Sequence, residues 1–126
     1  MSLSGERLQY VASETARALP GVDRGRPFTE RLDVHKVAGK VFLIITDDPE
    51  DLVVTVKAEP EYGELLQGQH PSITPGRYLD KRHWISLGAG PGVTEDLVAE
   101  LVDHSYHLVR QTLPLRCRPD ATRDWT

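Results

Sequence analysis

The sequence has 126 residues, of which 39% are hydrophobic and 27% charged, and its formal net charge is −4 at pH 7. It has no run of about eighteen apolar residues and no charged-then-apolar leader, so we expect one globular, cytoplasmic, monomeric domain without a membrane segment. Its one cysteine, Cys117, excludes an internal disulfide and a four-cysteine zinc site, while the negative charge excludes coating nucleic acid by bulk charge but permits a local basic patch.

The N-terminal segment predicts an amphipathic helix. Apolar residues recur at helical spacing over residues 4–19, Ser4 stands where an N-cap belongs, and Pro20 interrupts the pattern. The residues that follow, including Arg24 and Arg26, are polar and lack periodicity. They are interpreted as a linker to the first strand.

Residues 32–46 predict two strands folded about a turn at Gly39, because glycine adopts turn conformations without steric cost. Residues 52–58 alternate apolar and polar side chains, which predicts a strand covered on one face. The sequence leaves open whether Phe42 faces the helices or solvent, although the alternation of its strand favours the uncovered face for Lys40 and Phe42. The more aliphatic row of the same strand consists of Val41, Leu43 and Ile45.

The middle of the chain predicts short elements. Residues 59–67 form a short helix with Pro60 early in it, and residues 70–76 are interpreted as a loop. Two further short strands are expected, at residues 78–79 and 83–87.

A second long helix follows the glycine-rich residues 88–92. Thr94 is its N-cap, an apolar stripe runs along one face, and Pro114 ends it. The order helix, antiparallel strands, helix is typical of an α+β fold: a two-layer α/β sandwich with both long helices packed on one face of the sheet and the other face open to solvent. Residues 1–113 are assigned to this single domain and residues 114–126 to a C-terminal tail.

The open face is where we expect function. In a strand over residues 83–87, Ile85 and Leu87 point toward the helices, so Trp84 points away from them together with Arg82, and His83 points inward. A register slip of one residue would instead bury Trp84 as an ordinary core aromatic, and the sequence leaves this alternative open. The candidate binding residues are Arg77, Lys81, Arg82, Trp84, Lys40 and Lys57.

Such a platform suits base stacking and phosphate contacts, and an aromatic ringed by arginine equally suits a protein-binding hot spot. We therefore expect a small non-enzymatic domain that binds DNA or RNA on this face. The alternative is a protein–protein interaction module that docks a partner on the same face.

The sequence contains no complete catalytic or metal-binding motif. His104 and His107 are three residues apart on the second long helix, a spacing at which two imidazoles can bind one metal. Because no further ligand cluster accompanies them, they are interpreted as surface residues beside the apolar stripe. The glycines at residues 88–92 match no phosphate-binding signature. Ser72, Ser105 and Cys117 lack a recognisable base, and Ser105 is expected to bond within its helix, with Tyr106 at the helix border. No catalytic residue, metal or cofactor is predicted.

Several segments together resemble the MmcQ/YjbR family. They are GKVFLII at residues 39–45, the Lys57 strand, the loop at 75–78, DKRHWISL at 80–87, and residues 105–109. The resemblance spans most of residues 4–113 and implies the CyaY/frataxin-like, double-wing fold with an outward-pointing Trp84, and a DNA-binding function. Iron delivery is not implied, because the first helix offers only Glu6 and Glu14 as acids.

Overall fold

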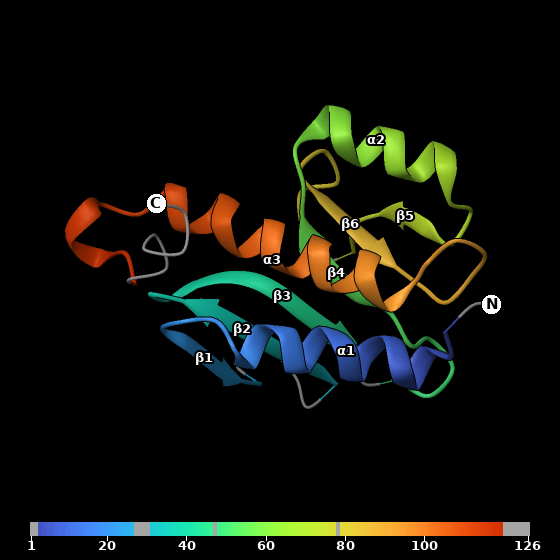
Figure 1. Ribbon diagram of the computed structural model, residues 1–126, viewed down its shortest axis with the longest axis horizontal. Helices are drawn as coiled ribbons and strands as arrows, with labels where there is room; N and C mark the ends of the chain where they lie inside the picture. Colours follow the sequence, from blue (N-terminus) through green and yellow to red (C-terminus); the bar gives the residue numbers. More distant parts are fainter. Residues whose placement is uncertain (1–2, 27–30, 47, 78, 120–126) are drawn as a thin grey trace.

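The computed structural model describes residues 3–26, 31–46, 48–77 and 79–119 (Figure 1). The helices are α1 (Gly5–Arg17), α2 (Pro60–Gln69) and α3 (Glu95–Gln111), followed by a 3-10 turn at Leu115–Cys117. The strands are β1 (Val22–Gly25), β2 (Leu32–Val37), β3 (Lys40–Thr46), β4 (Val54–Lys57), β5 (Ile73–Pro75) and β6 (Trp84–Leu87). They form one antiparallel six-stranded sheet in the order β1-β2-β3-β4-β6-β5.

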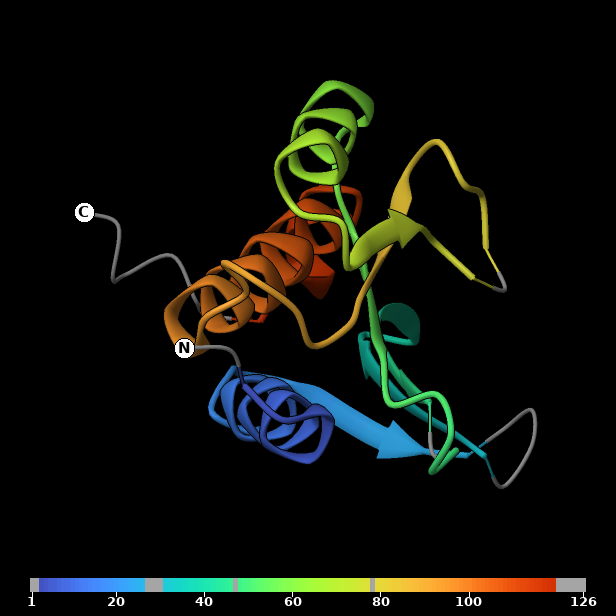
Figure 2. The same cartoon turned by 90° about the vertical axis from the view of Figure 1, so that its right-hand side faces the viewer.

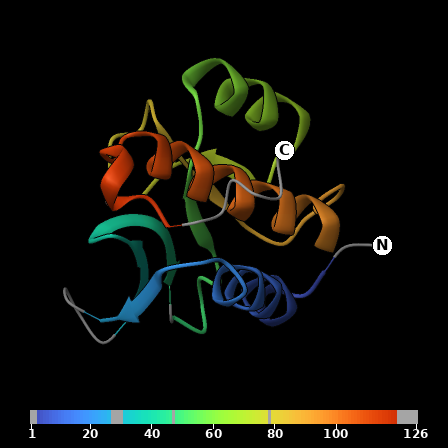
Figure 3. The same ribbon diagram turned by 60° about the vertical axis from the view of Figure 1, so that its left-hand side comes forward.

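The long helices α1 and α3 lie side by side on one face of the sheet (Figures 1 and 3). Arg7 of α1 joins them through two hydrogen bonds to the Glu95 carboxylate, at 3.0 and 3.1 Å. The short helix α2 packs against β5 and β6 at the other end of the sheet. Figure 2 shows α1 and α3 on one side of the strands. The predicted α+β sandwich is therefore confirmed.

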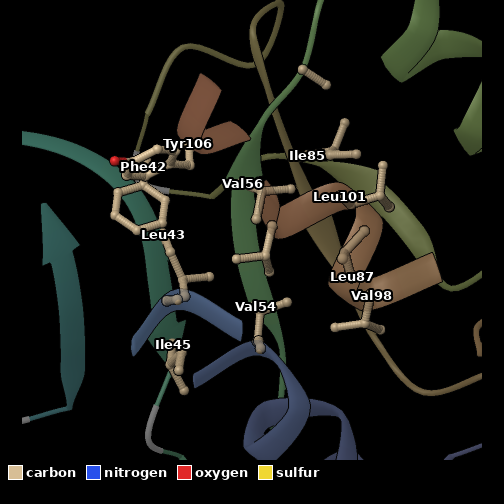
Figure 4. Packing of buried hydrophobic residues seen from close by; sticks show 14 of the residues in the cluster. Phe42, Leu43, Ile45, Val54, Val56, Ile85, Leu87, Val98, Leu101 and Tyr106 are labelled. Atoms are coloured by element: carbon tan, nitrogen blue, oxygen red, sulfur yellow. The ribbon is translucent and has the colours of Figure 1, made fainter. Parts of the chain in front are cut away.

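Both long helices begin where the sequence predicts. The hydroxyl of Ser4 accepts a hydrogen bond from the Arg7 amide at 3.1 Å, and that of Thr94 accepts one from the Leu97 amide at 3.2 Å. Figure 4 shows the core between helices and sheet. Its members include Leu43, Ile45, Val54, Val56, Ile85, Leu87, Val98 and Leu101. The helix-facing side of β4 and β6 is therefore the aliphatic one, as predicted.

Two edge strands were missed from the sequence. The segment interpreted as a polar linker forms β1, which pairs with β2 through Asp23 opposite Lys36 and Gly25 opposite Val34. The segment interpreted as a loop forms β5, which pairs with β6. Neither edge strand shows the clear alternation of a half-buried strand, so pairing with its neighbour decides its conformation.

Other predicted boundaries also shift. The strand expected at residues 83–87 begins at Trp84, and Leu79 belongs to no strand, while Tyr78 lies outside the described residues. Helix α2 continues through Gly68 to Gln69. Of the predicted tail, the residues up to Pro119 return to the end of α3, where Arg110 Nε donates to the Pro119 carbonyl at 3.0 Å. None of the helices described is long and apolar enough to span a bilayer.

A β-bulge changes which face Phe42 occupies. His35 pairs with Leu43 and Lys36 pairs with Val41, so Phe42 is the extra residue on β3. Phe42 and Leu43 consequently both face the helices, and Phe42 is fully buried with its ring edge-on to Tyr106 at 5.4 Å (Figure 4). The side of Phe42, which the sequence left open, is therefore the helix-facing one. The placement of Tyr106 at a helix border is wrong, because Tyr106 is fully buried.

His35 is a polar residue inside this core. Its side chain is fully buried, and neither ring nitrogen has a hydrogen-bond partner among the described residues. Burial lowers the pKa of His35, and the nearby Asp33 carboxylate acts in the opposite sense. The ring is therefore held in its neutral form.

We expect acid to destabilise the protein through His35. Because the folded-state pKa lies below the unfolded value of about 6.5, the unfolded chain binds the proton more readily. Stability is then complete above about pH 6.5 and falls, by at most about 1.4 kcal/mol per pH unit, as the pH drops toward the folded-state pKa. Urea unfolding of wild type and His35→Leu at pH 7.5 and 5.5 measures this. Equal losses in the two proteins would contradict it.

Candidate nucleic-acid interface

The sheet register places Trp84 and Lys57 side by side. Trp84 on β6 is directly opposite Lys57 on β4. Their neighbours Ile85 and Val56 belong to the helix-facing core, so the two side chains leave the sheet on its helix-free face. Both are half-buried. The predicted direction of Trp84 is correct, and the register slip is ruled out.

Gly76 sets the position of Trp84. The Gly76 amide donates to the Trp84 carbonyl at 2.7 Å. A Cβ atom at Gly76 would lie 2.5 Å from the Trp84 Cβ and 2.6 Å from its carbonyl carbon. The loop that follows β5 can therefore approach β6 this closely because residue 76 has no side chain.

The middle of the helix-free face is not exposed, contrary to the expectation that this whole face is open to solvent. One cross-strand row runs over Val34, Ile44, Thr55 and Ser86, and each of these residues is at most 1% exposed. The Thr55 and Ser86 hydroxyls are hydrogen-bonded at 2.8 Å, and the amide of Arg77 donates to Ser86 at 3.2 Å.

Two lysines on this face make no ion pair with any residue that the structure describes. They are Lys57, beside Trp84, and Lys36, which is opposite Val41 on the far side of the bulge. Asp23, across from Lys36 on β1, is the nearest acid in register. The Arg77 guanidinium is instead paired with the Asp51 carboxylate, so its charge is already partly compensated.

The structure separates the other predicted cations from Trp84. Lys81 and Arg82 belong to the turn before β6, where strand alternation does not apply, and they border a hollow on the side of Ile85 and α2. Lys40 is opposite Val37, whose side chain is in the core. The Lys40 side chain therefore leaves the sheet on its helix-facing side. The predicted placement on the helix-free face is correct for Trp84 and Lys57 and wrong for Arg82 and Lys40.

His83 does not point inward. Its side chain is 44% exposed, and its Nδ1 lies 2.8 Å from Asp80 Oδ2. Asp80 also accepts a hydrogen bond from the Arg82 amide at 2.9 Å, and these two bonds lower the pKa of Asp80. The carboxylate of Asp80 thus holds the turn in shape.

The two histidines of α3 have separate partners. His104 Nε2 lies 2.6 Å from Glu59 Oε1, whereas His107 Nε2 lies 3.4 Å from Asp103 Oδ1. Within residues 3–26, 31–46, 48–77 and 79–119, no three His, Cys, Asp or Glu side chains are grouped so that they could hold a metal ion. The two rings are therefore committed to different carboxylates.

The three candidate nucleophiles, Ser72, Ser105 and Cys117, are not arranged as catalytic groups. Ser105 does not bond within its helix as expected: its hydroxyl donates to the Phe42 carbonyl at 2.6 Å and accepts from the Lys57 amide at 2.8 Å. Cys117 is exposed and free of disulfide bonds. The Ser72 hydroxyl is buried without a described partner, against the position that a Gly90 side chain would occupy. None of the three has a histidine within hydrogen-bonding distance among the described residues.

Sequence reasoning missed Lys36 and Gly76. The signal for Lys36 was available, since Val34 and Lys36 share one side of a strand by period two. The signal for Gly76 was only its identity within a loop, and the close approach that requires a glycine becomes visible once β5 and β6 are paired.

Comparison with known proteins decides the family. The sequence matches the YjbR family over residues 17–108. The chain belongs to the YjbR family. Among YjbR relatives, the uncharacterized protein YbdF of Escherichia coli O157:H7 is 33% identical over 111 residues, covering 88% of this chain and 91% of YbdF. The uncharacterized protein YjbR of Escherichia coli strain K12 is 29% identical over 109 residues, covering 86% and 88%.

Solved structures share this fold. Protein DR2400 of Deinococcus radiodurans, described as a DUF419 domain, superimposes with a TM-score of 0.76 at 28% identity, covering 90% of this chain and 84% of that one. A Pseudomonas syringae protein superimposes with a TM-score of 0.65 at 20% identity, covering 81% and 97%, and shows a shared fold alone. The more specific CyaY-like comparison stays a prediction.

Proposed function

We propose that this YjbR-family protein binds single-stranded nucleic acid on its helix-free face without performing a reaction on it. The observation that carries the proposal is the cross-strand pair of Trp84 and Lys57. An indole on a sheet surface stacks with an unpaired base, and a lysine beside it binds the phosphate of the same nucleotide. Lys36 on the same face supplies further charge.

The bases in a duplex are already stacked and paired, so a stacking site selects unpaired strands. If three or four phosphates are contacted, log affinity falls with log salt concentration at a slope of about −2 to −3 for a single strand. This dependence is weaker than that of a duplex-coating protein, and it is consistent with a net charge of −4.

We expect Trp84→Ala to weaken binding of a fluorescent twelve-nucleotide strand by roughly 5- to 100-fold, because each stacked base contributes about 1–3 kcal/mol. Lys57→Gln should weaken binding and make the salt slope shallower by about 0.7. Fluorescence anisotropy at two salt concentrations, with DNA and RNA strands, measures both effects. Trp84→Phe, which keeps a stacking ring, should retain most of the affinity.

Lys40→Gln is the matched control, because it removes the same charge from the other side of the sheet. It should leave the affinity within about twofold, as expected for a distant exposed charge. A loss equal to that of Lys57→Gln would mean non-specific attraction, and binding unaffected by Trp84→Ala would refute the stacking site.

The second candidate is a protein-docking surface on the same face. It is favoured by the Asp51 carboxylate paired to Arg77, whose amide bonds to Ser86 on this face, because a carboxylate there disfavours a polyanion. Affinity capture from a nuclease-treated lysate separates the two functions. A partner that survives nuclease and is lost with Trp84→Ala would support docking, and a partner lost on nuclease treatment would have been bridged by nucleic acid.

A further inference from the structure

A separate hollow of ≈ 290 Å³ lies between α2 and the β5–β6 end of the sheet. Its floor is apolar and consists of Pro60, Gly63, Pro75 and Ile85. A Cβ atom at Gly63 would lie 3.2 Å from Ile85 Cγ2, so the absence of a side chain at residue 63 lets helix and strand approach closely where both line the hollow. Trp84 lies on the opposite face of the same strand, so this hollow is distinct from the proposed nucleic-acid site.

Four polar side chains converge on the rim of the hollow. Glu64 and Gln67 come from α2, and Lys81 and Arg82 come from the turn before β6. None of the four makes a side-chain hydrogen bond or ion pair within the part of the chain that the structure describes. Lys81 and Arg82, with Glu64, are solvent-exposed, and Gln67 is half-buried.

The backbone beneath these cations is nevertheless ordered. Asp80 accepts hydrogen bonds from the Arg82 and His83 amides, through its side chain at 2.9 Å and its carbonyl at 3.0 Å. The Asp80 carboxylate is therefore directed at the turn itself. Two adjacent positive charges are thus presented from a fixed turn, with their own side chains free to reach a ligand.

The chemistry of the rim selects the ligand. Adjacent lysine and arginine side chains suit a doubly charged anion, which a phosphate monoester is near neutral pH and a single carboxylate is not. Glu64 can accept a hydrogen bond from an N–H group, and the proline- and isoleucine-lined floor accommodates a flat or apolar body. The volume is at the lower end of small-molecule pockets, about 300–1000 Å³, so the body is about the size of one ring system.

We propose that this hollow binds a small phosphorylated molecule whose flat or apolar body carries an N–H donor. Lys81 and Arg82 hold the phosphate, Glu64 accepts from the N–H donor, and the body packs on Ile85 and the prolines where Gly63 holds α2 close to β6. The proposal is independent of the nucleic-acid surface, because it uses the other face of β6.

Cytidine monophosphate (CMP) is a suitable probe, because it combines a phosphate monoester with a planar ring bearing an amino group. Titration calorimetry of the whole chain should give a dissociation constant on the order of 100 μM, and cytidine or inorganic phosphate should each bind at least about tenfold more weakly. In NMR spectra, CMP should shift the amide signals of Gly63, Glu64 and Gln67.

Gly63→Ala should weaken CMP binding by about fivefold or more, because the added Cβ would lie 3.2 Å from Ile85 Cγ2 and would shift α2 against β6 where both line the hollow. Gly68→Ala on the same helix is its control: a Cβ there meets nothing within 4 Å, and CMP binding should be unchanged. Lys81→Gln and Arg82→Gln alter exposed side chains and should each weaken CMP by about tenfold.

Glu64→Gln should change the affinities for CMP and for inorganic phosphate in opposite directions. It should weaken CMP, which uses the carboxylate as an acceptor, and strengthen inorganic phosphate, which the carboxylate repels. Binding of CMP no tighter than inorganic phosphate, or CMP binding that tolerates Gly63→Ala, Lys81→Gln and Arg82→Gln, would overturn the proposal.

Discussion

Gly76→Ala should destabilise the protein by about 3 kcal/mol, because the new methyl group meets backbone. The atoms in its way are the Cβ and carbonyl carbon of Trp84, at 2.5 and 2.6 Å. Neither can rotate aside as a flexible side chain would, so the loop must retreat from β6. That movement breaks the hydrogen bond from the Gly76 amide to the Trp84 carbonyl, now 2.7 Å long.

Equilibrium urea unfolding followed by circular dichroism measures this cost, which corresponds to a fall in Tm of roughly 10 °C for a domain of this size. Gly68→Ala, in helix α2 with nothing within 4 Å of its added carbon, is the matched control. It should be neutral or stabilising by up to about 1 kcal/mol, because alanine favours a helix more than glycine does. If both substitutions had the same effect, the close approach of residue 76 to β6 would not exist in solution.

Ser105→Ala should cost about 2–6 kcal/mol, because the Ser105 hydroxyl bridges β3 and β4 beyond the end of their ladder. The last paired residues of β3 and β4 on that side are Leu43 and Val56. Beyond them, Ser105 donates to the Phe42 carbonyl at 2.6 Å and accepts from the Lys57 amide at 2.8 Å. Alanine leaves both backbone groups without a partner in or next to the core, at about 1–3 kcal/mol for each.

Thr15→Ala is the control for this prediction. Its hydroxyl donates to the Val11 carbonyl at 2.8 Å, a bond that stays within α1, and alanine is the better helix former, so little or no loss is expected. Hydrogen exchange of the Lys57 amide gives a second readout, since it should become much faster in Ser105→Ala. An unchanged exchange rate with unchanged stability would mean that Ser105 does not bridge the strands.

Local patterns were sufficient for the elements whose signal lies within one segment. The caps at Ser4 and Thr94 and the period-two alternation of β4 and β6 predicted where the long helices begin and which way Trp84 points. These features depend on neighbours within a few residues, and the physical preferences of those neighbours act before the chain is folded.

The candidate site was predicted in part. Trp84 and Lys57 were placed correctly because both belong to regular strands. Arg82 was misplaced because the strand begins two residues later and a turn does not follow strand alternation. Lys40 was misplaced, and the side of Phe42 could not be decided, because one extra residue in β3 reverses the alternation beyond it and nothing local in the sequence distinguishes a bulged strand from a regular one.

The α+β class, the two long helices, the direction of Trp84 and the family resemblance could all be predicted from the order of the residues. That β1 and β5 are strands, that the row from Val34 to Ser86 is buried, and that Lys81 and Arg82 border a hollow on the other face from Trp84 became visible in the folded chain. Edge strands, bulges and pockets gain their free energy from partners distant in the chain. A local pattern records the preference of a segment but not the partner that overrides it.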